Sequence, residues 1–400
     1  MWERAPAREQ HWRLVVSDRY TLYGWHLSYF TGKAMCYLRY KQIPFTQKPV
    51  DMVTLMWRIK RKVGAAVMPV VVTPDGQWIH DTSCIIDHLE ARWPEPSVHP
   101  ATPVQRFASY WMEAWGDEWW VPMAMHTRWT YPENYALFER EAGDALLPWM
   151  PRFVKRRAVK FVATTLRRML HFVGVRPPQM PVMDAWMDEM LDLLDAHFAQ
   201  QRFLFGDRPQ LGDFGLVGSM YGHLGRDPWP ARELVAPRPP LRAWLDRMSP
   251  PEPTSDRTAS GQSVLLANDA IAPTLTPVFQ AMAREFLPLL EGINAQVKAK
   301  LQDWPAGKPL PRRLADVQVP MGQGQFRRAA LPYTLWMAQR TLDVFHGMDA
   351  QEQAQVRDWL RRMGGERLLA LDIPRLKMHG VCVALDLEAA TRPCAADPKG

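Results

Sequence analysis

Residues 20–93 alternate between short apolar, β-branched runs and longer stretches with apolar side chains at helical spacing. The pattern predicts strands at residues 20–25, 43–50, 69–72 and 77–80, and helices at residues 29–41, residues 51–59 and from residue 81 onward. The Pro74-Asp75-Gly76 turn joins the last two strands into a hairpin. This β-α-β-α-β-β-α order predicts a small mixed sheet with helices on its faces.

From about residue 103 the pattern becomes almost entirely helical. Helices are predicted at residues 104–125, 183–201, 211–224, 241–248, 274–300 and 332–363, with one short β-prone stretch at residues 317–319. Eight prolines lie between residues 227 and 253, and proline cannot continue a helix. We therefore interpret residues 227–253 as a rigid connector rather than an element of the core.

The length of 400 residues suggests two or three domains. We expect an α/β domain at residues 20–93, an all-α domain at 103–249 and a mostly helical extension at 250–400. Hydrophobic residues make up 47% of the chain, which argues against general disorder. The sequence has no long apolar run for a membrane span and no signal-like apolar segment near residues 1–10, so we expect a cytoplasmic protein.

Charge and cysteine content narrow the function classes further. The net charge of +7 is dispersed and too small to argue for nucleic-acid binding. Cys36, Cys84, Cys382 and Cys394 are far apart in sequence, which argues against a zinc site and a disulfide framework. Residues 152–176 contain eight Lys or Arg residues and no acidic residue, interleaved with apolar ones. That pattern fits a solvated helical face, or a contact with an anionic membrane or an acidic partner.

Three segments resemble the cytosolic glutathione transferase superfamily in their order and spacing. They are LYGWHLSYFTGK at residues 22–33, VMPVV at 67–71 together with DTSCIIDHLE at 81–90, and FLFGDRPQLGDF at 203–214. The region covered runs from about residue 20 to residue 249. The resemblance implies a thioredoxin-like domain followed by a helical domain, with an additional mostly helical extension.

The resemblance also implies a glutathione site. Met68 precedes Pro69, which is a cis-proline in the family, and Met68 would pair through its backbone with the cysteinyl part of glutathione. Asp81 and Thr82 would hold the γ-glutamyl end, because a hydroxyl at a helix N-terminus suits a carboxylate. An ordinary trans proline and a plain helix N-cap are the alternatives.

Activation of the glutathione thiol needs a donor that stabilises the thiolate. Ser28 matches the serine position of the family, although Tyr29 stands where serine-type relatives have proline. Tyr29 is the nearest rival donor, and Thr31 is a weaker one. Ser28 serving only as a helix cap is the structural alternative. Because residue 28 is not cysteine, reduction through a mixed disulfide is not expected.

A stripe of tryptophans recurs every four residues at Trp111, Trp115 and Trp119, so the three side chains share one helix face. In the family this helix borders the hydrophobic substrate pocket, and we expect the stripe to line it, with core packing as the alternative. Asp213 lies in the family's folding motif, where Gln210 replaces the usual Ser or Thr, and we interpret Asp213 as structural.

The leading hypothesis is a glutathione transferase in which the glutathione thiolate attacks a hydrophobic electrophile. Glutathione would be a co-substrate, no metal is expected, and the family's usual assembly predicts a homodimer. A glutathione-dependent lyase or etherase would use the same site. The third alternative is a non-catalytic ligand-binding or interaction module, in which residues 152–176 would contact a membrane or a partner.

Overall fold

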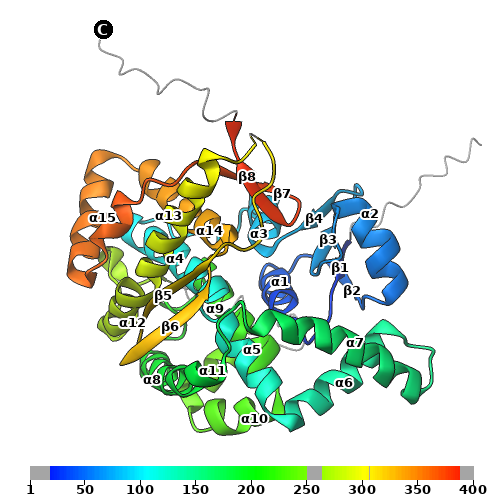
Figure 1. Ribbon diagram of the computed structural model, residues 1–400. Helices are drawn as coiled ribbons and strands as arrows, with labels where there is room; N and C mark the ends of the chain where they lie inside the picture. Colours follow the sequence, from blue (N-terminus) through cyan, green and yellow to red (C-terminus); the bar gives the residue numbers. More distant parts are fainter. Residues whose placement is uncertain (1–18, 250–263, 306, 388–400) are drawn as a thin grey trace, which may run out of the picture.

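The computed structural model describes residues 19–249, 264–305 and 307–387 (Figure 1). A four-stranded sheet of order β2-β1-β3-β4 forms its first part. Its strands are β1 (Tyr20–Tyr23), β2 (Phe45–Lys48), β3 (Val70–Val72) and β4 (Trp78–His80). β1 pairs in parallel with β2 and antiparallel with β3, so the predicted mixed, thioredoxin-like sheet is confirmed.

The helices of this part begin at the predicted places. They are α1 (Tyr29–Tyr40), a π-helical turn η1 (Thr54–Ile59) that continues into α2 (Lys60–Val63), and α3 (Thr82–Arg92). Ser28 is the N-cap of α1, and its Oγ accepts a hydrogen bond from the Thr31 backbone N–H at 3.3 Å. Such a cap satisfies one of the N–H groups that the first helical turn leaves without a partner.

The middle of the chain is helical. Its main elements are α4 (Pro103–Trp119), α5 (Val121–Thr130), α6 (Pro132–Leu146), α7 (Arg152–Leu170), α8 (Met180–Phe198), α9 (Leu211–Ser219) and the π-helical η3 (Met220–Leu224). The single helix predicted at 104–125 is divided at Trp120, two residues before Pro122, a residue that cannot donate a backbone hydrogen bond. α6 was not predicted.

The described part of the proline-rich stretch, residues 227–249, is not a connector, which corrects the prediction. It forms α10 (Pro228–Pro230), the π-helical η4 (Ala231–Val235) and α11 (Pro239–Met248), with prolines in the first turn, where no N–H is needed. Leu241 and Trp244 of α11 are buried. Trp244 Nε1 donates to Asp213 Oδ1 at 3.0 Å. Asp213 also accepts from the backbone of Leu204 and Gln210, so its role is structural.

The later residues wrap around α4. Their longer elements are α12 (Thr276–Ala281), the π-helical η8 (Met282–Phe286), α13 (Leu287–Gln302), the hairpins β5 (Asp316–Met321) with β6 (Gly324–Ala329) and β7 (Leu376–His379) with β8 (Cys382–Leu385), α14 (Pro332–His346) and α15 (Ala350–Met363). The β-prone stretch 317–319 lies in β5, and the second hairpin was not predicted. Figure 1 shows α13, α14 and α15 gathered around α4.

One large hydrophobic core is shared by the sheet, the middle helices and the later residues, and two smaller clusters lie beneath α6 and α7 and beside η1. The largest cluster of buried apolar side chains extends from Tyr20 in β1 to Val383 in β8. The extension therefore shares the core of the first 249 residues. The three domain ranges stay a prediction. Outside the described residues lie the boundary at residue 250, residues 1–10 and Cys394.

Candidate functional site

Three chain segments meet at one end of the sheet because of the strand register. Tyr23 is paired with Lys48 on one side and with Val70 on the other, and Val70 is paired with His80. Consequently Gly24, the residue before Val70 and the residue after His80 lie next to one another where the strands end. The predicted anchor residues Met68, Pro69, Asp81 and Thr82 are thus gathered at the end of β1 that leads to Ser28.

The connection between β1 and α1 is tightly held. The Gly24 N–H donates to the Lys48 carbonyl at 3.2 Å, and Trp25 Nε1 donates to the Val50 carbonyl at 2.8 Å. A Cβ on Gly24 would lie 2.4 Å from the Thr31 side chain, so a larger residue does not fit there. Ser28 is half-buried at the end of this turn, and its cap bond uses Oγ as the acceptor. The Ser28 O–H therefore remains available to donate.

Tyr29 does not lie at the site, which corrects the prediction that it rivals Ser28. Its ring is buried between α1 and α9, with a Gly218 Cβ position only 2.5 Å from the ring. The Tyr29 hydroxyl donates to the Gly116 carbonyl of α4. Burial raises the pKa of Tyr29 well above its ordinary value. Tyr29 therefore links α1 to α4 through a buried hydrogen bond of its uncharged hydroxyl. Thr31, the weaker candidate, is fully buried beneath Gly24.

The Met68–Pro69 peptide bond is cis, as the resemblance implies. Met68 is half-buried and Pro69 is buried directly before β3. The backbone of Met68 thus lies at the sheet end beside the β1–α1 turn.

Asp81 and Thr82 form the N-terminus of α3. Asp81 adopts a φ of 71°, and its Oδ1 caps the helix by accepting from the N–H groups of Ser83 and Cys84. Its other oxygen, Oδ2, accepts from the Tyr333 hydroxyl of α14 at 2.6 Å. Thr82 is only 3% exposed. The α3 terminus is therefore covered by a residue of the extension.

A cavity of about 440 Å³ lies beside the β1–α1 turn, on the side away from Met68 and Asp81. It is lined by residues 24–27, Gln47 and Pro49 on the sheet side and by Glu141, Asp144, Ala145 and Arg226 on the helical side. Arg226 pairs with Glu141 at 2.5 Å. Burial, followed by the nearby Arg226 charge, lowers the pKa of His26. The cavity thus offers the His26 imidazole and a paired guanidinium beside the turn that leads to Ser28.

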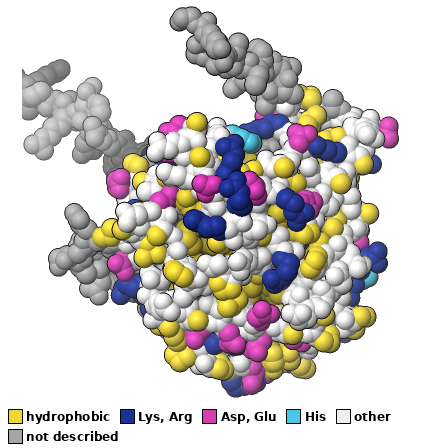
Figure 2. Space-filling view, turned by 90° about the vertical axis from the view of Figure 1, so that its left-hand side faces the viewer, with side chains coloured by type: hydrophobic (Ala, Val, Ile, Leu, Met, Phe, Trp, Pro, Cys, Tyr) yellow, Lys and Arg dark blue, Asp and Glu magenta, His cyan; other side chains and the backbone are white. Residues whose placement is uncertain are grey.

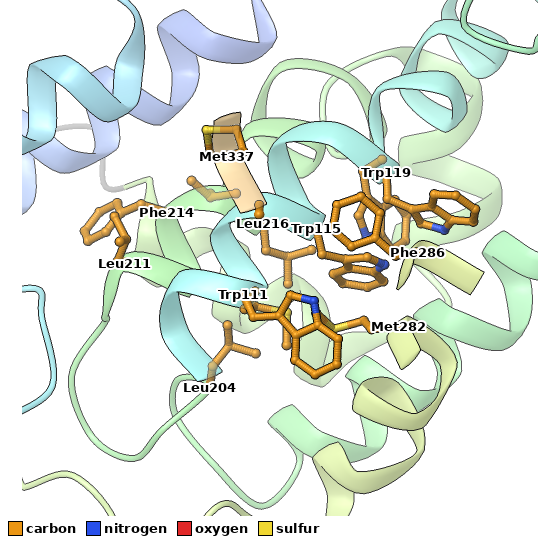
Figure 3. Close-up of a cluster of buried hydrophobic side chains, with 14 of the residues drawn as sticks. Trp111, Trp115, Trp119, Leu204, Leu211, Phe214, Leu216, Met282, Phe286 and Met337 are labelled. Atoms are coloured by element: carbon orange, nitrogen blue, oxygen red, sulfur yellow. The ribbon is translucent and has the colours of Figure 1, made fainter. Parts of the chain in front are cut away.

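The tryptophan stripe does not line this cavity, which corrects the expected substrate pocket. Trp111, Trp115 and Trp119 are at most 1% exposed and point toward the extension (Figure 3). Trp111 packs on Phe279 and Trp359, and Trp119 packs on Phe286. These partners all belong to residues after 250, whose position the sequence pattern did not reveal. The stripe is core.

Sequence reasoning missed a buried ionic cluster between α1 and α4. Lys33 is fully buried, and its Nζ contacts Glu113 at 2.7 Å and Asp117 at 2.5 Å. Ser83 Oγ donates to Glu113, and Arg340 of α14 lies 3.4 Å from the same carboxylate. A lysine within the apolar face of a helix was the available signal, since such a charge is rarely buried unless it is paired.

Burial raises the pKa of Asp117, while the Lys33 and Arg340 charges hold the pKa of Glu113 below its usual range against the effect of burial. Burial also raises the pKa of Glu118, one residue further along α4, to about 7. The carboxylates of α4 therefore connect α1, α3 and α14 and lie apart from the cavity. Within the described residues, His, Cys, Asp and Glu form no group of three that could hold a metal ion.

Comparison with protein families matches two stretches of the chain. Residues 22–97 match the glutathione S-transferase N-terminal domain, and residues 185–247 match the glutathione S-transferase C-terminal domain. No curated protein sequence gives a significant match. The first matched stretch contains the sheet end described above, and the second contains α9, α11 and Asp213.

Comparison with solved structures finds similar chains at low identity. A glutathione S-transferase from Rhodospirillum rubrum is 17% identical, covering 62% of this chain and 94% of its own, with a TM-score of 0.38. A glutathione S-transferase from Methylobacterium radiotolerans, in complex with glutathione sulfonate, is 22% identical over 62% and 98% of the two chains, with a TM-score of 0.35. A beta-etherase from a Sphingobium species is 21% identical over 57% and 94%, with a TM-score of 0.37.

Proposed function

Because the chain belongs to the glutathione S-transferase superfamily, we propose that it binds glutathione at the sheet end formed by β1, β3 and β4. The observation that carries this proposal is the register. It brings Met68, Asp81 and Thr82 beside the turn that ends at Ser28. The backbone of Met68 would pair with the cysteinyl part, and Thr82 at the N-terminus of α3 would hold the γ-glutamyl carboxylate.

In this proposal Ser28 stabilises the glutathione thiolate. The half-buried hydroxyl caps α1 through its oxygen and keeps its hydrogen for the sulfur. The N-terminus of α1 adds its partial positive charge, and both effects lower the pKa of a bound thiol. The chain's part is to orient the tripeptide and to favour the anion, which then attacks an electrophilic carbon.

The electrophile would occupy the cavity between the β1–α1 turn and α6, not the tryptophan stripe. The cavity lining contains Trp25, Leu27 and Ala145 as apolar surface and a few polar groups, the usual mixture in a small-molecule site. Transferase, lyase and etherase reactions would share this arrangement, because they differ only in the group that leaves the carbon.

A second candidate is a non-catalytic ligand-binding or interaction module with the glutathione transferase fold. It is favoured by the α3 terminus, where Thr82 is only 3% exposed and Asp81 is already bonded to Tyr333. For glutathione to reach Thr82, the N-terminal turn of α14 would have to move. A calorimetric titration with glutathione separates this candidate from the first.

Assembly and location remain proposals. The homodimer would place the small domain of one subunit against the helical domain of the other. In this chain α14 already packs between α3 and α4, where Arg340 pairs with Asp87 and Glu113. A dimer would therefore need another surface. We keep a cytoplasmic location as a proposal; no helix among the described residues is long and apolar enough to cross a membrane.

Calorimetric titration with glutathione tests the binding proposal. We expect binding by the wild-type chain and a loss of about 1–3 kcal/mol in Thr82→Ala, because the γ-glutamyl carboxylate loses a hydrogen-bond donor. Thr165→Ala is the matched control, since Thr165 is exposed on α7 and its hydroxyl bonds only within that helix. Absence of binding by the wild type at millimolar glutathione would overturn the proposal and favour the non-catalytic module.

A further inference from the structure

The exposed apolar surface of this protein is concentrated in two segments. Eleven large apolar side chains are exposed among the described residues, and eight of them lie at residues 53–57 and 149–169. The eight are Val53, Met56, Trp57, Trp149, Met150, Phe153, Phe161 and Met169. Single exposed apolar residues need no explanation, whereas a concentration of them indicates an interaction surface.

Helix α7 turns its largest apolar side chains outward. Phe153 and Phe161 are 74% and 76% exposed, whereas Val159 and Ala163 face inward and are buried. At 100° per residue, Phe153, Arg157, Lys160, Phe161 and Arg168 fall on one face of the helix. The segment is therefore not the usual amphipathic helix with all its apolar residues inside, which was the simpler interpretation of its sequence.

The basic side chains of α7 also fall into two groups, those that contact neighbouring helices and those on the outward face. Lys155 and Arg156 pair with Asp144 and Glu139 of α6. Arg152 also contacts Asp144, and Arg167 lies over the rings of Trp129 and Tyr135. Within the described part of the chain, Arg157, Lys160 and Arg168 on the outward face form no ion pair. The outward face thus combines two phenylalanines with three uncompensated positive charges.

The segment η1–α2 repeats this combination. Val53, Met56 and Trp57 are exposed, and Arg58, Lys60, Arg61 and Lys62 follow them on the surface. Among the described residues, these four basic side chains have no acidic partner. Met52 packs on the apolar cluster that includes Phe138 of α6 and Val159 of α7, so the two segments are neighbours. Figure 1 shows α2 and α7 on the same side of the molecule.

The opposite side of the molecule has a different surface. Figure 2 shows basic and acidic side chains lying next to one another there. On α15, Arg361 pairs with Asp358 and Glu366, and nearby Arg367 pairs with Glu291. Of the five exposed aromatic side chains among the described residues, four lie on the side that carries η1, α2 and α7, beside basic side chains that form no ion pair.

We propose that the surface formed by η1, α2, the 147–151 loop and the outward face of α7 binds peripherally to an anionic lipid bilayer. Lys and Arg are attracted to anionic headgroups, while Trp and Phe enter the boundary between headgroups and acyl chains. Trp149, at 94% exposed in the loop before α7, is suited to that boundary. A nucleic acid or an acidic protein would use the charges but gives no reason for so many exposed apolar side chains.

Vesicle co-sedimentation of the full chain tests this proposal. We expect sedimentation with vesicles of phosphatidylcholine and phosphatidylserine, much less with phosphatidylcholine alone, and a decrease as salt is added. Arg157→Glu combined with Lys160→Glu should weaken binding by at least about 25-fold, because each basic residue near an anionic surface contributes roughly fivefold. The matched control is Arg357→Glu combined with Arg362→Glu on α15, which should leave binding unchanged.

A second variant separates insertion of the rings from charge alone. Phe153→Ser combined with Phe161→Ser keeps every charge, and we expect it to weaken vesicle binding by about tenfold or more. Both Phe side chains are exposed, so circular dichroism should match the wild type. No sedimentation of the wild type with phosphatidylserine vesicles at low salt would overturn the proposal. Equal loss in the α15 variant, or retardation by nucleic acid with no vesicle binding, would overturn it as well.

Discussion

Two regions stood out in the sequence, the end of the sheet and the tryptophan face of α4. They differ in whether nearby or distant residues determine their contacts. At the sheet end, short-range signals suffice: a strand, a proline, a turn and a helix cap determine where Met68 and Asp81 lie. On α4, the period of four correctly placed Trp111, Trp115 and Trp119 on one face. What that face contacts depended on residues more than 150 positions away.

A periodic apolar stripe therefore identifies the buried face of a helix but not the element that covers it. The tryptophans pack on α12, η8 and α15 and hold the extension to the rest of the chain. The same extension then reaches the sheet end, where Tyr333 bonds to Asp81. The two regions are therefore connected through residues that the resemblance does not cover.

The largest effect is expected at the tryptophan face. Trp115→Ala should lower the free energy of unfolding by about 3–5 kcal/mol, because it leaves a large cavity in the core. Urea unfolding followed by circular dichroism measures this loss. The matched control is Trp57→Ala, which removes a side chain that is 69% exposed and should change stability by less than about 0.5 kcal/mol.

A cost near zero for Trp115→Ala would mean that the stripe lines open space after all. If the alanine variant fails to fold, Trp115→Phe keeps the test usable. That variant should be destabilised by less than the alanine variant and should leave glutathione binding intact.

The next largest effect is a pH dependence of the free energy of unfolding that arises at Glu118 of α4. Burial raises the pKa of Glu118 to about 7 from its ordinary value of 4.5. The folded protein therefore holds this proton more tightly than the unfolded chain does. The stability from Glu118 is present below about pH 4.5 and is lost as the pH rises through 7. The loss should amount to about 2–3 kcal/mol between those limits.

Urea unfolding across this pH range, with wild type and Glu118→Gln compared, isolates that contribution. The variant should lose less stability than wild type as the pH rises, because glutamine does not titrate. Asp117 shifts in the same direction, so the difference between the two proteins, rather than the slope of either, is the quantity to compare. Parallel slopes would contradict a raised pKa at Glu118.

The smallest stability effect is expected where the extension meets the sheet end. Tyr333→Phe removes the hydroxyl that bonds to Asp81 Oδ2 and should cost about 1.5 kcal/mol, since the acceptor is a charged group. If Tyr333 also covers the glutathione anchor, the variant should change the glutathione association rate in stopped-flow measurements. An unchanged rate with reduced stability would leave Tyr333 a purely structural contact.

Much of the fold followed from local pattern, and the site followed only in part. The mixed sheet, α1, α3 and the structural role of Asp213 could be predicted, because strand register and helix capping are short-range properties. Tyr29 was misjudged, since the sequence does not show which way a first-turn hydroxyl points. The covering of Thr82 by α14 arises from tertiary packing, which no local signal encodes. Lys33 on the apolar face of α1 did indicate a buried charge, but the pattern does not show that its partners lie on α4.

The role proposed for Ser28 is to hold the thiol of bound glutathione as a thiolate, and a pH titration of the thiolate absorbance of the glutathione complex measures this role. We expect Ser28→Ala to raise the pKa of the bound thiol by about one to two units, the value of one hydrogen bond to a charged sulfur. Tyr29→Phe is the control and should leave that pKa unchanged, because the Tyr29 hydroxyl donates to Gly116. A thiol pKa that is the same in wild type and Ser28→Ala would contradict this role.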